Sequence, residues 1–174
     1  MRLMLAFLVP MAHIAPMIEI KLKDQIAIVD DEFSDLAENW VWHLHRASHC
    51  LYARGYRSGN RKGGLFYMHR IITNAPKGLD VDHKNGNGLD NRTCNLRICR
   101  RSQNNANRKR VQSKTSRFKG VHFENCTQRW RSELTVNGKR IRLGRFPSEE
   151  QAVNAYMKAA KEHFGEYANK AEKP

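Results

Sequence analysis

Acidic residues are scarce in this chain, which has 17 Asp and Glu against 31 Lys and Arg and a formal net charge of +14. An excess of this size attracts polyanions, and nucleic acid is the commonest of them. An acidic membrane would instead be met by a basic amphipathic helix with a broad apolar face, which the sequence lacks. We therefore expect a nucleic-acid partner and no membrane contact.

Cysteines are few and irregularly spaced, with no Cys-x-x-Cys pair and too low a density for a disulfide scaffold. A zinc site built on Cys94 and Cys99 would lack two further ligands at a suitable spacing. Reduced thiols are the default interpretation, and they favour a cytoplasmic protein. The four cysteines are Cys50, Cys94, Cys99 and Cys126.

Long hydrophobic runs are also missing. Residues 1–16 imitate a signal peptide, with Arg2 ahead of an apolar run, but Pro10 interrupts the run and no Ala-x-Ala cleavage site follows. The run is also too short to span a bilayer. We interpret residues 1–16 as a disordered or artefactual extension, with Met17 as a candidate natural start.

The rest of the chain divides into blocks of different pattern. Residues 17–75 form a β-rich N-terminal unit, because apolar residues alternate with polar ones between Gly-rich turns. Within it we expect a short helix inside 30–39 and strands near 18–22, 26–29, 40–44, 51–54 and 65–72. Residues 76–110 have little apolar content, so a few anchors must hold them, namely Val81, Leu89, Leu96 and Ile98. A basic linker, 111–117, leads to a regular block at 118–170.

Residues 97–119 contain basic side chains and no acid. A charge run of this kind is usually a solvated face. Its place between two compact blocks favours an arm that lies along phosphates, where each neutralised phosphate adds salt-dependent affinity. The candidate phosphate contacts are Arg97, Arg100, Arg101, Arg108, Lys109, Arg110 and Lys119.

The strongest chemical signal is Leu-Asp-Val-Asp-His-Lys-Asn-Gly-Asn-Gly-Leu-Asp-Asn-Arg-Thr-Cys-Asn-Leu-Arg, residues 79–97. Phosphodiester hydrolysis requires a base for the attacking water and a cation for the charge that develops on the phosphate. Asp82 and His83 are neighbours on an expected strand and point to opposite faces. One can hold a metal while the other faces water. Alone, however, the pair is a weak signal, and Asn-Gly-Asn-Gly is also a common turn sequence.

The ordered set Val-Asp-His, Asn-Gly-Asn, Asp-Asn and Asn-Leu-Arg, followed by an Asn in a helix capped by Ser102, resembles the HNH endonucleases of the phage- or intron-encoded homing type. The resemblance implies a ββα-metal (His-Me finger) core in which Asp82 and Asn104 bind the metal. His83 would be the general base, and Asn95 would orient it and steady the loop. Asn105 and Asn107 lie near enough to replace Asn104.

An amide at the last motif position, where many members have His, favours Mg²⁺ or Mn²⁺ over Zn²⁺ as the single divalent ion. Arg70 follows His69 ahead of the motif, as in this subgroup. A phosphate contact and a purely structural role for Arg70 are both open.

The last block alternates regularly. From 118 to 146 the pattern predicts three strands, with Asn137-Gly138 as a hairpin turn. Ser148 and Gln151 then open a helix whose apolar stripe covers the sheet, and Gly165 is placed to stop it. The outer face of the sheet carries the charged residues.

Four pieces of this block resemble the Apetala2/ethylene-response-factor domain, namely Phe-Lys-Gly-Val, Trp-Arg-Ser-Glu-Leu, Arg-Leu-Gly-Arg-Phe and Glu-Glu-Gln-Ala-Val-Asn-Ala-Tyr. In that family the sheet enters the major groove, although several matching positions here carry unusual residues. The docking mode can therefore carry over without the sequence preference. The implied DNA contacts are Lys119, His122, Glu133, Thr135, Arg140 and Arg142, and Arg131 is a further candidate.

These observations predict an α+β protein with a small β-rich N-terminal unit, an HNH nuclease core, and a three-stranded antiparallel sheet packed on one helix. The expected function is site-specific, metal-dependent hydrolysis of double-stranded DNA, with nicking of one strand if the protein is a monomer. A non-catalytic DNA-binding regulator that retains the HNH scaffold is the alternative. An RNA-binding protein is less favoured, because the exposed sheet face offers no aromatic stacking platform.

Overall fold

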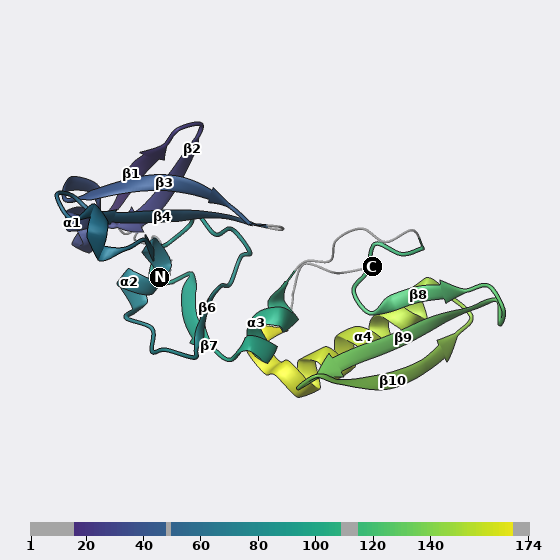
Figure 1. Ribbon diagram of the computed structural model, residues 1–174. Coiled ribbons are helices and arrows are strands. Elements are labelled where there is room, and N and C mark those ends of the chain that lie inside the picture. The colour runs from purple at the N-terminus through teal and green to yellow at the C-terminus, as the bar shows by residue number, and fades with distance from the viewer. Residues whose placement is uncertain (1–15, 48–49, 109–114, 169–174) are drawn as a thin grey trace, which may run out of the picture.

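The computed structural model describes residues 16–47, 50–108 and 115–168 (Figure 1). The expected extension, except Pro16, lies outside these residues, as do Lys109, Arg110 and most of the basic linker. The chain is an α+β protein built from small antiparallel sheets, as predicted.

The N-terminal part contains a two-stranded and a three-stranded sheet. The first pairs β1 with β2, and the second has the order β3-β4-β5. The expected strands near 18–22, 26–29, 40–44 and 51–54 and the short helix are confirmed. The elements are β1 (Met17–Leu22), β2 (Gln25–Asp30), η1 (Asp31–Phe33), α1 (Ser34–Glu38), β3 (Trp40–Arg46), β4 (Leu51–Arg57), η2 (Arg61–Gly63), β5 (Phe66–Tyr67) and α2 (Met68–Thr73).

The strand expected over residues 65–72 is wrong for most of its length. Only β5 pairs with β4, and from Met68 the chain turns into helix α2. The apolar residues Met68, Ile71 and Ile72 are also spaced as on one helix face, an ambiguity that short apolar runs carry. The helix ends at Asn74, whose left-handed φ of 46° closes its last turn.

Alternation along β1 and β2 places one side of that hairpin in the N-terminal core. The buried set includes Leu89 from the loop of the HNH motif, so this core reaches beyond residues 17–75. The members are Ile20, Leu22, Ala27, Val29, Leu36, Ala53, Met68 and Leu89.

The middle part is a hairpin followed by a helix, formed by β6 (Asp80–His83), β7 (Leu96–Cys99) and α3 (Arg101–Asn107). Ser102 does not cap α3, contrary to the expectation. The cap is Arg100, whose extended backbone donates its N–H to Gln103 Oε1 at 2.8 Å. Of the expected anchors, Val81, Leu89 and Leu96 are buried, but Ile98 is 37% exposed.

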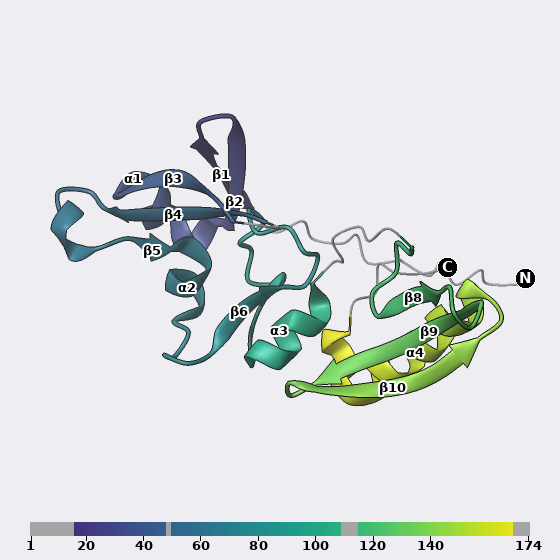
Figure 2. The same cartoon turned by 45° about the vertical axis from the view of Figure 1, so that its right-hand side comes forward.

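The C-terminal part has the sheet order β10-β9-β8 with α4 against one face (Figures 1 and 2). Asn137 and Gly138 form the predicted hairpin turn, both with positive φ. Ser148 Oγ accepts the Gln151 N–H, and α4 ends at Gly165 as expected. The elements are β8 (Val121–Glu124), β9 (Arg129–Val136), β10 (Lys139–Phe146), α4 (Glu149–Phe164) and η3 (Gly165–Tyr167).

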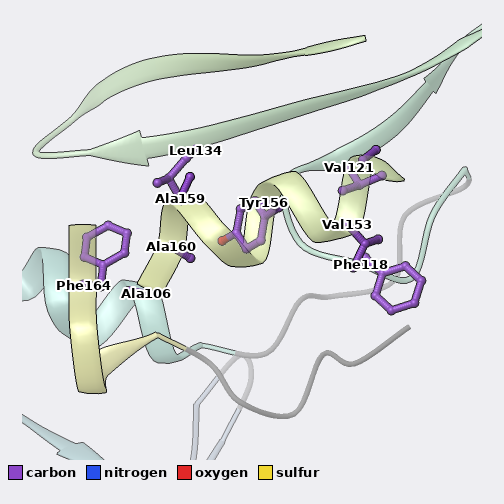
Figure 3. Packing of buried hydrophobic residues seen from close by; sticks show 10 residues of the cluster. Ala106, Phe118, Val121, Leu134, Val153, Tyr156, Ala159, Ala160 and Phe164 are labelled. Atoms are coloured by element: carbon purple, nitrogen blue, oxygen red, sulfur yellow. The ribbon is translucent and has the colours of Figure 1, made fainter. Parts of the chain in front are cut away.

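The C-terminal core lies between α4 and the inner face of the sheet (Figure 3). Leu134 and Val121 come from the strands, and Val153 and Tyr156 come from α4. Ala106 of α3 belongs to the same cluster. The helix of the HNH motif is therefore packed into the C-terminal core rather than into a core of its own.

Gly120 precedes β8 at a close backbone approach, with φ +70° and an added Cβ only 2.3 Å from Glu133 O. We predict that Gly120→Ala lowers the free energy of unfolding by about 2 kcal/mol or more, since both the left-handed backbone and the clash are costly. The measurement is thermal unfolding. Gly138→Ala is the matched control, because Gly138 has φ +78° but open space around it. Equal losses in the two variants would refute the close-approach argument.

Candidate functional site

Asp82 lies on β6 and is 5% exposed. Its Oδ2 accepts from Arg97 Nε at 2.8 Å and forms an ion pair with Arg97 Nη2 at 2.6 Å. Its Oδ1 accepts from Asn107 Nδ2 at 2.9 Å. Removing one partner of a buried ion pair typically costs about 3–5 kcal/mol, so Arg97 strongly constrains this carboxylate.

His83 is the next residue of β6 and is 4% exposed. Its Nε2 lies 3.2 Å from Asn91 Oδ1. Because Asn91 Nδ2 already donates to Leu89 O, we assign the Asn91 oxygen as the acceptor and His83 Nε2 as the donor. This tautomer leaves the lone pair on Nδ1. Burial lowers the pKa of His83, while the Asn91 hydrogen bond and the Asp82 and Asp90 carboxylates raise it less, so the ring is neutral at pH 7.

Aromatic rings surround His83. The His69 ring lies edge-on at 5.1 Å between centroids, and the Tyr52 ring lies at 5.9 Å. Burial lowers the pKa of His69 to about 3, so this second imidazole is also uncharged at pH 7. The N-terminal part therefore supplies one wall of the His83 site through β4 and α2.

Asn95 holds the loop between β6 and β7. Its Oδ1 accepts the Asn85 N–H at 3.0 Å, and its Nδ2 donates to Asp90 O at 2.7 Å. These contacts match the loop-steadying part of its expected role. The side chain that hydrogen-bonds to the His83 ring is Asn91, which is fully buried. Asn91 belongs to the Asp-Asn pair of the motif at residues 79–97, but no role was predicted for it.

The same loop is fixed from outside by β2. Ile28 N donates to Leu89 O and Asn91 N donates to Ile28 O, both at 2.8 Å, which adds a short parallel bridge. Asp30 Oδ2 accepts from both the backbone N–H and the hydroxyl of Thr93 at 2.7 Å. The loop is thus an extension of the β1–β2 hairpin.

The amides of α3 reach β6 at two points. Asn104 Nδ2 donates to Asp80 Oδ2 at 2.9 Å, whereas Asn107 Nδ2 donates both to Asp82 Oδ1 and to His83 O at 2.9 Å. The structure therefore brings Asn107 to Asp82 and places Asn104 beside Asp80.

Asp82 and His83 line a cleft of about 250 Å³ together with Asn104, Asn107 and Arg108. Across the residues that the structure describes, no three His, Cys, Asp or Glu side chains gather closely enough to hold a metal ion by themselves. The cleft offers oxygen donors, a carboxylate and carboxamides. Mg²⁺ and Mn²⁺ suit such donors and complete their coordination with water and phosphate oxygens.

The expected phosphate contacts differ in accessibility. Arg100, Arg101 and Arg108 are exposed, and Arg101 and Arg108 line the cleft. Arg97 is largely enclosed at Asp82, so a phosphate contact would require that ion pair to open. Arg70 donates to the carbonyls of three residues, Ala75, Pro76 and Leu79, which is a structural role.

Lys119 binds the C-terminal end of α3. Its Nζ donates to Asn105 O at 2.5 Å, Ala106 O at 3.0 Å and Arg108 O at 3.3 Å. A cation at these carbonyls satisfies unpaired helix acceptors and is favoured by the helix dipole. A DNA contact by Lys119 would compete with these bonds.

The outer face of the C-terminal sheet carries basic side chains that form ion pairs with two glutamates. Glu133 lies within 3.6 Å of His122, Arg131 and Arg140, and Glu124 lies within 2.8 Å of Arg131 and Arg145. By strand register, the expected contacts His122, Arg131, Glu133, Thr135, Arg140 and Arg142 share this face.

Arg145 also lies on this face, although it was not among the predicted contacts. Strict alternation with Ile141 and Leu143 would turn it inward. A β-bulge between Arg142 and Gly144 shifts the register by one residue, so Arg145 pairs with Arg131 and points outward. Gly144, with φ +137°, was the sequence signal available for the bulge.

Within the described part of the chain, helices are too short or too polar to span a bilayer.

Two family models match the chain, an HNH endonuclease model over residues 66–106 and an AP2 domain model over residues 116–166. An uncharacterized HNH endonuclease of Acanthamoeba polyphaga mimivirus is 29% identical over 147 residues, 84% of this chain and 74% of that protein. Protein 3.8 of Escherichia phage T7 is 38% identical over 64 residues, 37% of this chain and 53% of that protein. The chain thus spans about half of the phage protein. No solved structure matches.

The tautomer of His83 can be tested directly. In the wild type we predict ring ¹⁵N shifts of a neutral imidazole with the proton on Nε2, because Asn91 Oδ1 accepts there. Asn91→Ala removes the acceptor and should give a mixture of tautomers. Asn87→Ala, in the same loop but exposed, is the control. An Nδ1-protonated ring in the wild type would contradict the assignment.

Proposed function

We propose, from an HNH endonuclease segment and an AP2 domain in one chain, that this protein is a site-specific, divalent-metal-dependent DNA endonuclease of the homing type. It hydrolyses a phosphodiester of double-stranded DNA. The observation that carries the proposal is the pairing of Asp82 and a neutral, buried His83 on the wall of one cleft with exposed arginines.

His83 is the general base in this proposal. Its Nδ1 takes the proton of the attacking water, while the hydrogen bond from Nε2 to Asn91 fixes the ring. A neutral imidazole at pH 7 can accept this proton without first losing one. Asn95 acts on the loop, since its contacts are to Asn85 and Asp90.

Asp82 and an amide of α3 hold the cation. A divalent ion there would stabilise the charge that develops on the phosphate and the leaving oxygen. Asn104 was the residue expected from the motif, but Asn107 is the amide in contact with Asp82. Turning the Asn107 carboxamide would present its oxygen on the same side, whereas Asn104 would have to leave Asp80.

Two sets of side chains bind the DNA in this proposal. Arg100, Arg101 and Arg108 are placed for phosphates near the reacting bond, with Lys109 and Arg110 as further candidates. The outer face of the C-terminal sheet, with Arg140 and Arg142, enters a groove and selects the site. With one Asp82–His83 pair per chain, a monomer nicks one strand.

The direct test is incubation of the full chain with supercoiled plasmid carrying a site selected for binding. We predict nicking with Mg²⁺ or Mn²⁺ and none with EDTA. His83→Ala should lower the rate at least about 100-fold, the usual contribution of a general base, with DNA affinity retained. His43→Ala is the control, since His43 lies on β3 away from the cleft.

Binding of the selected site without cleavage in any metal would instead support the non-catalytic regulator. Unchanged cleavage by His83→Ala would refute the role given to that residue.

The metal ligand from α3 can be identified with two matched variants. We expect Asn107→Ala to raise the dissociation constant for Mn²⁺ at least about tenfold, and Asn104→Ala to raise it less, because only Asn107 contacts Asp82. Mn²⁺ binding is measured by electron paramagnetic resonance on DNA-bound protein that also carries His83→Ala, which prevents cleavage. Melting temperatures check that both variants fold. The reverse order would assign the role to Asn104.

A further inference from the structure

Arg97 lies between Asp82 and the C-terminal end of the described chain. Its Nε and Nη2 face Asp82 Oδ2, and its Nη1 donates to Glu166 O at 2.8 Å. The guanidinium carbon lies 4.2 Å from the centroid of the Tyr167 ring. One side chain that is 11% exposed thus donates both to Asp82 and to Glu166, which lies 69 residues beyond Arg97 in the chain.

Glu166 and Tyr167 belong to η3, the turn that follows α4. Tyr167 also packs against the core between α4 and the sheet, so its ring is fixed by the C-terminal unit. It lies one residue beyond the segment that matches the AP2 domain model. Through this turn the C-terminal unit contacts Arg97 of β7.

The same unit contacts α3 independently. Ala106 is buried in the C-terminal core, and Lys119 binds the last carbonyls of the helix. Figure 3 shows Ala106 and Phe164 in that core, and Figures 1 and 2 both place α3 beside the end of α4. Asn107, which contacts the other oxygen of Asp82, follows directly.

We propose that Arg97 is a positioning residue through which the turn at Glu166 and Tyr167 orients the Asp82 carboxylate, so that the C-terminal unit is part of the metal site. This inference rests on the function proposed above. Arg97 occupies Oδ2, whereas Oδ1 faces Asn107, the amide that is proposed above to turn its oxygen toward the cation. Since each carboxylate oxygen has two lone pairs, Oδ1 keeps a lone pair for a cation. Partners of this kind typically change metal affinity by about 10- to 100-fold.

The rival role for Arg97 is the phosphate contact expected from the basic run. The two roles predict different losses. If Arg97 contacts a phosphate, its loss should weaken DNA binding in EDTA and reduce the salt dependence of that binding. If Arg97 is a positioning residue, its loss should leave DNA binding in EDTA intact and weaken the binding of the metal ion.

The test uses full-length variants in the His83→Ala background, bound to the selected duplex, with Mn²⁺ binding followed by electron paramagnetic resonance. Arg97→Gln should raise the Mn²⁺ dissociation constant about tenfold or more. Tyr167→Ala should raise it about threefold, as expected for loss of a cation–π contact, and Tyr167→Phe should stay near the wild type because the ring remains. DNA affinity in EDTA should be unchanged in all three.

A double-variant cycle separates this effect from general destabilisation. If Tyr167 acts through Arg97, Tyr167→Ala should have no further effect on Mn²⁺ affinity once Arg97→Gln is present. Additive effects, or wild-type Mn²⁺ affinity in Arg97→Gln, overturn the inference even while the parent protein cleaves DNA. Failure of the proposed function looks different, since the parent would then neither bind Mn²⁺ at this site nor nick plasmid.

Discussion

The loop between β6 and β7 has almost no apolar side chains, and the whole site depends on the hydrogen bonds that hold it. Buried polar groups are costly unless they are paired, so this loop has a defined shape only where partners surround it. Asn91 and Asn95 supply the inner partners, and β2 supplies the outer ones. The orientation of His83 follows from that network.

As a consequence, the segment that matches the HNH endonuclease model shares the hydrophobic cores of both neighbouring units. Leu89 is buried among residues of the N-terminal unit, and Ala106 is buried among those of the C-terminal unit. A segment of about thirty residues with so few apolar side chains cannot bury enough surface to fold alone. The N-terminal unit therefore has a structural function, because it supplies the β2 bridge and the Tyr52 wall.

The basic side chains of this molecule have two different roles, and the amino-acid composition does not distinguish them. Some basic side chains remain exposed along the cleft, as Arg101 and Arg108 do. Others, such as Arg70, Arg97 and Lys119, donate hydrogen bonds to backbone carbonyls or to a buried carboxylate. Both kinds count equally toward the net charge of +14, but only the first kind is exposed to an approaching polyanion.

The sequence by itself determined the α+β class, most of the strands, the hairpin at Asn137-Gly138, the capped helix α4, and the HNH and AP2 segments. These features depend on local periodicity, turn chemistry and residue order. Only the tertiary structure decided which amide meets Asp82, that Asn91 holds His83, and that the bulge at Gly144 turns Arg145 outward. It also replaced the expected strand at 65–72 with α2. The contacts of Asp82 and His83 join segments far apart in the chain, which no local pattern specifies, whereas Gly144 and the spacing of Met68, Ile71 and Ile72 were local signals too ambiguous to decide the bulge and α2.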